Sequence, residues 1–291
     1  MEDSPLVPPK LAILVSILAV STASILIRMS NAPALAIASY RMLLSTLILS
    51  PYFFYTGGIE KVRSIGRKGA LMLILIGIVL AIHFGSWITS LSLTTVASSV
   101  IFVHIDPIFV ALISHFFLSE RVSRRTIFGI ILGMSGATLI AVGDAGMGEL
   151  NLYGDLLALV GGIMLGIYIL GGRALRQKMD LTSYVTPVYF TSALVLLLVS
   201  FFTGTKLSGY APREYLLFLV IAIVPMIFGH TVYNWALKYV EAPIVSLSLL
   251  GEPVGASILA YIFLGEIPTS IILIGGALTL SGILITVHRQ Q

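Results

Sequence analysis

The chain has 291 residues, of which 57% are hydrophobic and only 10% are charged. Soluble domains carry about 25% charged residues, so this excess of apolar surface does not fit into one core, and the lipid bilayer must solvate much of it. The absence of cysteine excludes a disulfide framework, a thiolate metal site and a thiol nucleophile. The net charge of +4 does not indicate nucleic-acid binding, because the basic residues are confined to short loops.

Apolar stretches long enough to cross a bilayer as helices, which takes about 20 residues, follow one another along the chain. The first is expected to be a retained helix rather than a signal peptide, because many further spans follow it. The linkers are short and leave no room for a soluble domain. We therefore predict an all-α integral membrane protein with ten transmembrane helices, at about 10–28, 33–56, 69–91, 95–118, 125–144, 153–173, 183–203, 214–237, 243–264 and 268–287.

The loops differ strongly in their content of lysine and arginine. With the N-terminus placed in the cytoplasm, thirteen of the 17 Lys and Arg residues fall in predicted cytoplasmic loops, and only Arg28, Lys206 and Arg213 fall in the opposite loops. Cytoplasmic loops of membrane proteins carry such an excess of positive charge. We therefore expect a multi-pass protein of the cell membrane with both termini in the cytoplasm.

The second half of the chain repeats features of the first at an offset of 146 residues. The aligned residues include Asp106-Pro107 with Glu252-Pro253, Glu120 with Glu266, Gly129 with Gly275, Gly136 with Gly282, and Trp87 with Tyr233. Each half, residues 1–146 and 147–291, holds five predicted helices, so the second half enters the membrane from the opposite side. Inverted repeats of this kind are a transporter architecture, in which the substrate site lies near the bilayer midplane.

Three charged residues lie deep inside predicted spans, away from the span ends: Arg41, Asp106 and Glu252. A charge there costs about 2.5–3.5 kcal/mol on insertion scales, so it needs a partner or a function. Each of the two acids precedes a proline, which frees a backbone carbonyl one turn earlier, so each either binds a proton or cation or supports a helix kink. Arg41 keeps its proton and therefore needs an acid, backbone carbonyls, water or an anionic substrate.

Two polar and aromatic patches lie in the third and eighth spans. His83 and Trp87 are four residues apart, as are His230 and Asn234, so each pair shares one face of its helix. Together with Tyr233, these side chains are expected to line a central cavity. The alternative is that the histidines form hydrogen bonds between helices and the aromatic rings only pack.

Glutamates also end the fourth and ninth spans. Glu120 and Glu266 are expected to cap a helix or to pair with a nearby basic loop residue such as Arg124. The sequence contains no nucleotide-binding loop of the GxxxxGK type, no HExxH and no acid-rich cluster. Transport by this chain should therefore be driven by a gradient, without a cofactor or a resident metal.

Three segments of the sequence resemble the signatures of the drug/metabolite transporter superfamily, EamA type. They are ASYRMLLSTLILSP (38–51), HFGSWITSLSLTTVASSVIFVHIDPIFVALISHFFLSE (83–120) and YNWALKYVEAPIVSLSLLGEPVGASILAYIFLGE (233–266). The resemblance implies two inverted EamA repeats and a central cavity between the first, third, fourth, sixth, eighth and ninth helices. It carries the following residues toward the centre: His83, Trp87, Asp106, Tyr168, His230, Asn234 and Glu252. The first half departs from the commoner Glu-Pro with Asp106-Pro107, which argues against strictly equivalent roles for the two acids.

These observations favour a secondary active transporter of a small metabolite. The resemblance implies export or import of a compound such as an amino acid or a drug-like molecule by alternating access, and export is the direction that we expect. Protons are the candidate coupling ion, acting through Asp106 or Glu252. The expected partners are a small-molecule substrate and the bilayer, with no nucleic acid, and the protein is expected to be a monomer or a homodimer. The alternatives are a passive channel and an intramembrane enzyme acting on lipids, which would need convergent acids or a metal site.

Overall fold

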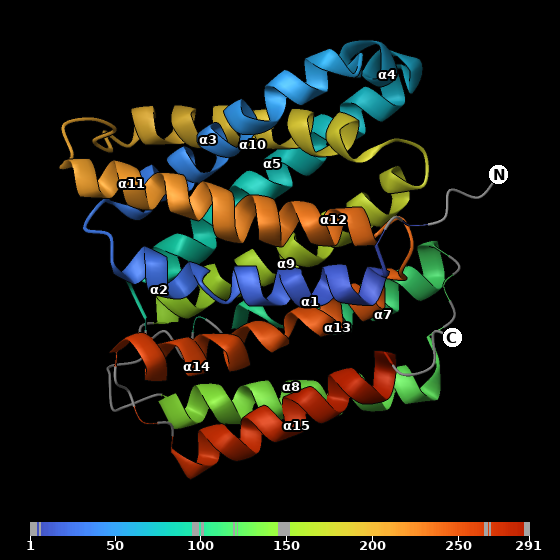
Figure 1. The fold of residues 1–291 in the computed structure, drawn as a ribbon, viewed down its shortest axis with the longest axis vertical. Helices are drawn as coiled ribbons and strands as arrows, with labels where there is room; N and C mark the ends of the chain where they lie inside the picture. The colour runs from blue at the N-terminus through green and yellow to red at the C-terminus, as the bar shows by residue number, and fades with distance from the viewer. Residues whose placement is uncertain are drawn as a thin grey trace.

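The computed structural model describes residues 5, 7–94, 99, 102–118, 120, 122–144, 152–264, 267 and 269–287. In these residues the regular structure is entirely helical, and the helices lie along roughly one common direction (Figure 1). They are α1 (Pro9–Val20), α2 (Ala23–Arg28), α3 (Ala34–Tyr55), α4 (Gly58–Ser64), α5 (Gly66–Ser90), α7 (Asp106–Phe117), α8 (Arg124–Asp144), α9 (Leu152–Arg176), α10 (Leu181–Phe202), α11 (Pro212–Ile221), η1 (Ala222–Thr231), α12 (Val232–Ala236), α13 (Ala242–Leu249), α14 (Gly251–Leu264) and α15 (Ser270–Val287).

Within the described part of the chain, seven helical segments are long and apolar enough to cross a membrane. They are Pro9–Arg28, Ala34–Tyr55, Gly66–Ser90, Leu152–Arg176, Leu181–Phe202, Pro212–Ala236 and Ala242–Leu259. Helices α7, α8 and α15 lie in the three other stretches predicted from the sequence, and the total of ten spans stays a prediction. Large apolar side chains such as Leu18, which is 60% exposed, cover the outside of the bundle, as expected for a protein solvated by lipid.

The acid–proline pairs begin new helical segments. Asp106 is the first residue of α7, and Pro107 lies in the first turn of that helix. In the ninth predicted span α13 ends at Leu249, and α14 begins one residue before Glu252. Proline is tolerated in a first turn because the N–H group that it lacks would have no helical acceptor there. The sequence predicted kinks at these two places, and the structure has breaks.

The first predicted span is also broken, at Ser21 and Thr22 between α1 and α2. The hydroxyl group of Ser21 donates to the carbonyl oxygen of Ile17, and that of Thr22 donates to the carbonyl oxygen of Ala19, each at a distance of 2.7 Å. Gly255 of α14 packs against the break, since a Cβ atom at Gly255 would lie 2.1 Å from Ser21 Oγ. Small residues here allow the two helices to approach closely.

The eighth predicted span contains a π-helix. η1 includes Pro225 and lies between α11 and α12 without a break in the chain. Ser45 of α3 donates its hydroxyl to the carbonyl oxygen of Ala222 at 3.2 Å, at the start of this segment. π-helical turns are rare and occur frequently at functional sites. This one carries His230 toward the centre of the bundle.

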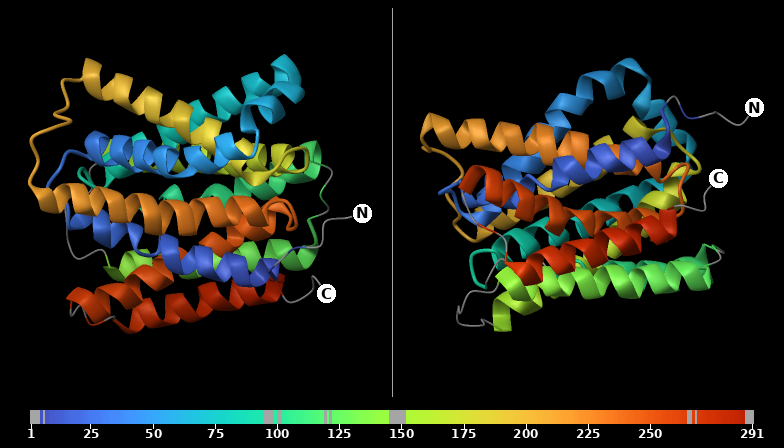
Figure 2. Two further views of the ribbon diagram at one scale, coloured as in Figure 1. Left: turned by 45° about the horizontal axis from the view of Figure 1, so that its top comes forward. Right: turned by 60° about the horizontal axis from the view of Figure 1, so that its bottom comes forward.

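Helices α8 and α15 lie side by side at one edge of the bundle in both Figure 1 and Figure 2. A Cβ atom at Gly129 would lie 2.8 Å from the carbonyl oxygen of Gly282, and one at Gly136 would lie 2.5 Å from that of Gly275. Residue numbers rise along α8 as they fall along α15, so the two helices are antiparallel. Their backbones are in contact because glycines occupy the crossing.

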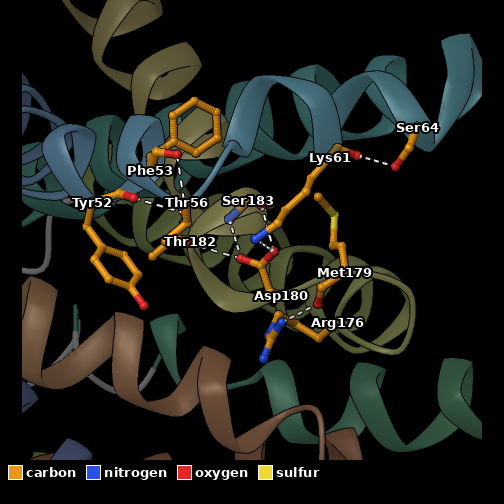
Figure 3. Close-up of polar contacts among 10 residues, drawn as sticks. All are labelled: Tyr52, Phe53, Thr56, Lys61, Ser64, Arg176, Met179, Asp180, Thr182 and Ser183. Carbon is orange, nitrogen blue, oxygen red and sulfur yellow. Dashed lines mark hydrogen bonds and ion pairs between the residues drawn. The ribbon is translucent and has the colours of Figure 1, made fainter.

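A short helix that the sequence did not predict, α4, contacts the turn between α9 and α10 (Figure 3). Asp180 caps α10, since its carboxylate accepts from the backbone N–H of Ser183 at 3.0 Å and pairs with Lys61 Nζ of α4 at 3.1 Å. Partial burial acts to raise the pKa of Asp180, but the bonds from Ser183, Lys61 and Thr182 outweigh it and lower that pKa to about 2. This turn therefore holds its acid in the charged form.

Candidate functional site

A small, narrow cavity with room for about one water molecule lies between the helices. Apolar side chains from α1, α2, α9 and α13 form part of its wall. The polar and aromatic residues that line it are Arg41, His83, Trp87, His104, His230, Tyr233 and Glu252. Six of these seven were predicted as site residues from the sequence, and they come from segments far apart in the chain.

His83 and Trp87 form one wall of the cavity on α5. Their rings stack at a centroid distance of 6.0 Å with 10° between the planes. The Nδ1 atom of His83 lies 2.8 Å from the carbonyl oxygen of Gly161 on α9. Because a carbonyl oxygen only accepts, Nδ1 carries the hydrogen and donates. The histidine therefore both joins two helices and faces the cavity, which combines the two interpretations that the sequence left open.

His230 and Tyr233 form the opposite wall. Tyr233 OH and His230 Nδ1 are 2.7 Å apart, and the rings of His83 and His230 have centroids 6.3 Å apart. Behind this wall, Asn234 Nδ2 donates to Tyr168 OH at 2.8 Å and to the carbonyl oxygen of His230 at 2.6 Å. Tyr168 and Asn234 are both fully buried. These two predicted residues therefore support the cavity wall rather than line the cavity.

Arg41 enters the cavity from α3 and is only 1% exposed. Its Cζ atom lies 4.1 Å from the centre of the Phe84 ring, which is a cation–π contact. Its Nε, Nη1 and Nη2 atoms have no hydrogen-bond partner among the described residues. The acid or carbonyl partner that the sequence offered as one explanation is therefore not found in that part of the chain.

The two intramembrane acids occupy different environments although they align in the repeat. Glu252 lines the cavity, its side chain is 17% exposed, and its Oε2 atom lies 3.7 Å from Nε2 of His104. Asp106 is completely buried, does not line this cavity, and accepts a hydrogen bond from Ser246 Oγ at 2.5 Å. Only Glu252 is thus placed to exchange a proton with a molecule in the cavity.

His104 is not among the site residues predicted from the sequence; in a continuous helix it would face away from Asp106, two residues later. In the structure His104 lies in a turn before α7, so helical spacing does not apply across it. The turn brings His104 to the cavity beside Glu252. The signal available in the sequence was Pro107, since a proline favours the first turn of a helix and so marks a helix start.

One end of the bundle is tied by a polar cluster that we call the clasp: Glu120, Arg173, Arg176 and Gln177 together with the turn 237–242. Arg173 Nε donates to Glu120 Oε1 at 2.6 Å, and Arg173 Nη1 donates to the carbonyl oxygen of Leu237 at 2.7 Å. The other oxygen of Glu120 accepts from the backbone N–H of Ala242 at 3.2 Å, at the start of α13. Arg176 Nε donates to the carbonyl oxygen of Asn234 at 3.1 Å.

The clasp corrects one detail predicted from the sequence. Glu120 does cap a helix and pair with a basic residue, but its partner is Arg173 of α9 and not Arg124. Its repeat mate, Glu266, lies outside the described residues.

A family profile and several relatives that match this chain are named as transporters or exporters. The profile of the EamA-like transporter family matches residues 9–142 and 152–288. An uncharacterised transporter of Archaeoglobus fulgidus is 25% identical over 262 residues, covering 88% of each chain. A pseudopaline exporter of Pseudomonas aeruginosa is 23% identical over 92% of this chain and 93% of its own.

Two further matches are more limited in what they show. A probable terminal-alkyne amino-acid exporter of Streptantibioticus cattleyicolor is 26% identical over 64% of this chain and 62% of its own. One solved crystal structure superposes with a TM-score of 0.81 over 96% of this chain and 97% of that chain, at 17% identity. At that identity the superposition shows a shared fold and nothing more.

Proposed function

The chain belongs to the EamA-like transporter family, and from that premise we propose that it is a secondary active transporter that exports a small metabolite across the cell membrane by alternating access. As a multi-pass membrane transporter it handles a small-molecule substrate within the bilayer. The observation that carries the proposal is the cavity, where charged and aromatic side chains meet inside an apolar bundle. Such convergent polar groups in a concave site are typical of small-molecule binding.

We further propose that the architecture is ten helices in two inverted repeats, residues 1–146 and 147–291. The contact between α8 and α15 supports it. Gly129 faces Gly282 while Gly136 faces Gly275, and the offset of 146 exchanges these two contacts with each other. A contact that maps onto itself in this way indicates a two-fold axis. The antiparallel direction of the two helices favours an axis in the membrane plane, as inverted repeats require.

Alternating access needs an end that closes and opens. The clasp is our candidate for the cytoplasmic gate, because it joins α9 to the turn before α13 and to the end of α7. The positive-inside pattern favours the cytoplasm for this end and for both termini. Export is favoured by the names of two relatives, the pseudopaline exporter and the terminal-alkyne amino-acid exporter. An amino acid or a drug-like compound is accordingly the substrate class to test first.

The test starts with thermal-shift screening of the purified protein against amino acids, nucleosides and cationic drugs. Any compound that stabilises the protein is then assayed in proteoliposomes with and without a proton gradient. Gradient-driven accumulation supports a secondary transporter, whereas equilibration at the same rate with and without the gradient indicates a passive channel. Proton coupling through the acids is tested with Asp106→Asn and Glu252→Gln. Wild-type transport rates in both variants would contradict this coupling.

A further inference from the structure

Two buried side chains that line the cavity carry hydrogen-bond donors without a partner among the described residues. Arg41 contributes three guanidinium nitrogens, and Trp87, which is 4% exposed, contributes its indole Nε1. None of these four atoms has a hydrogen-bond partner in the described part of the chain, and both residues line the cavity. A buried charge without hydrogen bonds is costly, by several kcal/mol after relaxation. The pair therefore marks a place where a ligand supplies acceptors.

The acid that lines the cavity does not bond to these donors. Glu252 is that acid, and its Oε2 atom lies 3.7 Å from Nε2 of His104. No ion pair within 4.0 Å joins Arg41 to an acid among the described residues. The His83 Nδ1–H group is taken up by Gly161. The guanidinium charge of Arg41 is therefore not paired directly with an acid in the described part of the chain.

We propose that Arg41 anchors the carboxylate group of the transported solute and that Trp87 Nε1 donates to the same group. A guanidinium offers parallel N–H donors that match the two oxygens of a carboxylate, which is the strongest kind of neutralising hydrogen bond available there. The stacked rings of His83 and Trp87 provide an apolar surface for the remainder of the solute. This assignment rests on the proposed function, because it names the chemistry that the transport site selects.

The chain itself provides an optical probe. It has two tryptophans, and the second, Trp235, borders a separate, apolar groove on the outside of α1 and α12. The variant Trp235→Phe therefore leaves Trp87 as the only indole. Its fluorescence is titrated with hydrocinnamate, hydrocinnamide and phenethylamine, and with L-phenylalanine and L-phenylalaninamide. These probes share a ring and a chain and differ in whether they carry a carboxylate.

The expected result is that each carboxylate changes the Trp87 emission at a concentration at least about tenfold lower than its matched amide. Adding Arg41→Gln should abolish that preference, and Arg41→Lys should keep part of it because a point charge remains. Arg213→Gln, at an exposed arginine in the first turn of α11, is the matched control and should leave the preference unchanged. The proposal is overturned if no carboxylate binds more tightly than its amide, or if the preference persists with Arg41→Gln.

The same probes, assayed for gradient-driven transport, distinguish a failure of the carboxylate site from a failure of the proposed transport function. If solutes without a carboxylate are transported as fast as their carboxylate partners, the protein is a transporter but Arg41 does not select for a carboxylate. If carboxylates bind in a way that depends on Arg41 but none of the bound solutes is transported, the carboxylate site is supported and the transport function is contradicted. If Arg41→Gln does not fold, the charge-retaining Arg41→Lys variant decides between the outcomes through its weaker preference.

Discussion

The clasp and the cavity both take arginine side chains out of water, but they treat them differently. In the clasp, Arg173 donates to Glu120 and to a backbone carbonyl, and Arg176 donates to the carbonyl oxygens of Asn234 and Met179. In the cavity, Arg41 packs on the face of Phe84, and its guanidinium nitrogens have no hydrogen-bond partner among the described residues. A buried cation that is paired within the protein supports structure. One that is left unpaired beside a cavity points to a ligand.

The two intramembrane acids also differ in whether they are enclosed by the protein or face the cavity. Asp106 is enclosed and bonded to Ser246, whereas Glu252 faces the cavity with 17% of its side chain exposed. Their alignment in the repeat therefore does not give them one role. The difference predicts which substitutions change transport and which change stability.

The largest effect is expected at Glu252. Glu252→Gln should lower proton-driven transport by at least about tenfold, because the amide cannot exchange a proton with the cavity, while the unfolding temperature stays within a few degrees of wild type. Asp106→Asn is the matched control and should lower transport much less, since it keeps the shape of a buried group. Rates are measured in proteoliposomes with an imposed proton gradient. Equal losses in both variants would remove the contrast between the acids.

The clasp should respond in stability. Arg173→Gln removes the partner of a largely buried carboxylate, which costs up to about 3 kcal/mol. Arg173→Lys keeps the charge but loses the second donor, so it should fall between wild type and Arg173→Gln. Thermal unfolding in detergent measures the order of the three proteins. An unchanged unfolding temperature in Arg173→Gln would show that the clasp does not hold this end of the bundle together.

Two adjacent glycines test the packing between α8 and α15, where no charge is involved. A Cβ atom at Gly275 would lie 2.6 Å from the carbonyl oxygen of Gly136, so Gly275→Ala should destabilise the protein by about 1–3 kcal/mol. A Cβ atom at Gly276 would meet only Val254 at 3.8 Å, so Gly276→Ala should be neutral or slightly stabilising. The two single variants are compared by thermal unfolding, and equal behaviour would contradict the close contact.

The smallest effect is expected at Asp180, outside the membrane-spanning segments. Its pKa is lowered to about 2 in the folded protein, below the usual value of about 3.9. The stability it contributes is therefore present above about pH 4 and is lost as the pH falls toward about 2. Because its side chain is 41% exposed, solvent screening should keep the contribution below about 1 kcal/mol.

Asp180→Asn keeps a helix cap but cannot titrate, so it isolates this acid. The wild type should lose its margin over the variant as the pH is lowered from about 5 to about 3 in thermal unfolding. A margin that does not change over this range would show that Asp180 adds no pH-dependent stability.

The sequence predicted where the helices lie far better than where they break. Hydropathy locates apolar stretches, but it does not register that backbone hydrogen bonding is interrupted at Ser21 or before Asp106. Five residues predicted to line the cavity, together with Glu252, meet there because polar side chains in apolar helices must face the bundle interior. The partner of Glu120 was predicted wrongly because it lies 53 residues away, on a helix whose packing no local pattern specifies. His104 was not predicted because it lies in the break before α7, which hydropathy does not reveal.

The central claim is that the cavity is reached alternately from the two sides of the membrane, and the cysteine-free chain allows a direct test. Ala23→Cys places a thiol on the cavity wall, and Leu18→Cys places one on the exposed outer surface of α1 as a control. Each is labelled in vesicles with a charged, membrane-impermeant thiol reagent applied to one side at a time. The account predicts that the cavity thiol reacts from both sides, that substrate raises one rate while lowering the other, and that the Leu18→Cys thiol in lipid does not react. Labelling of the cavity thiol from one side only, or from both sides at rates that substrate leaves unchanged, would contradict it.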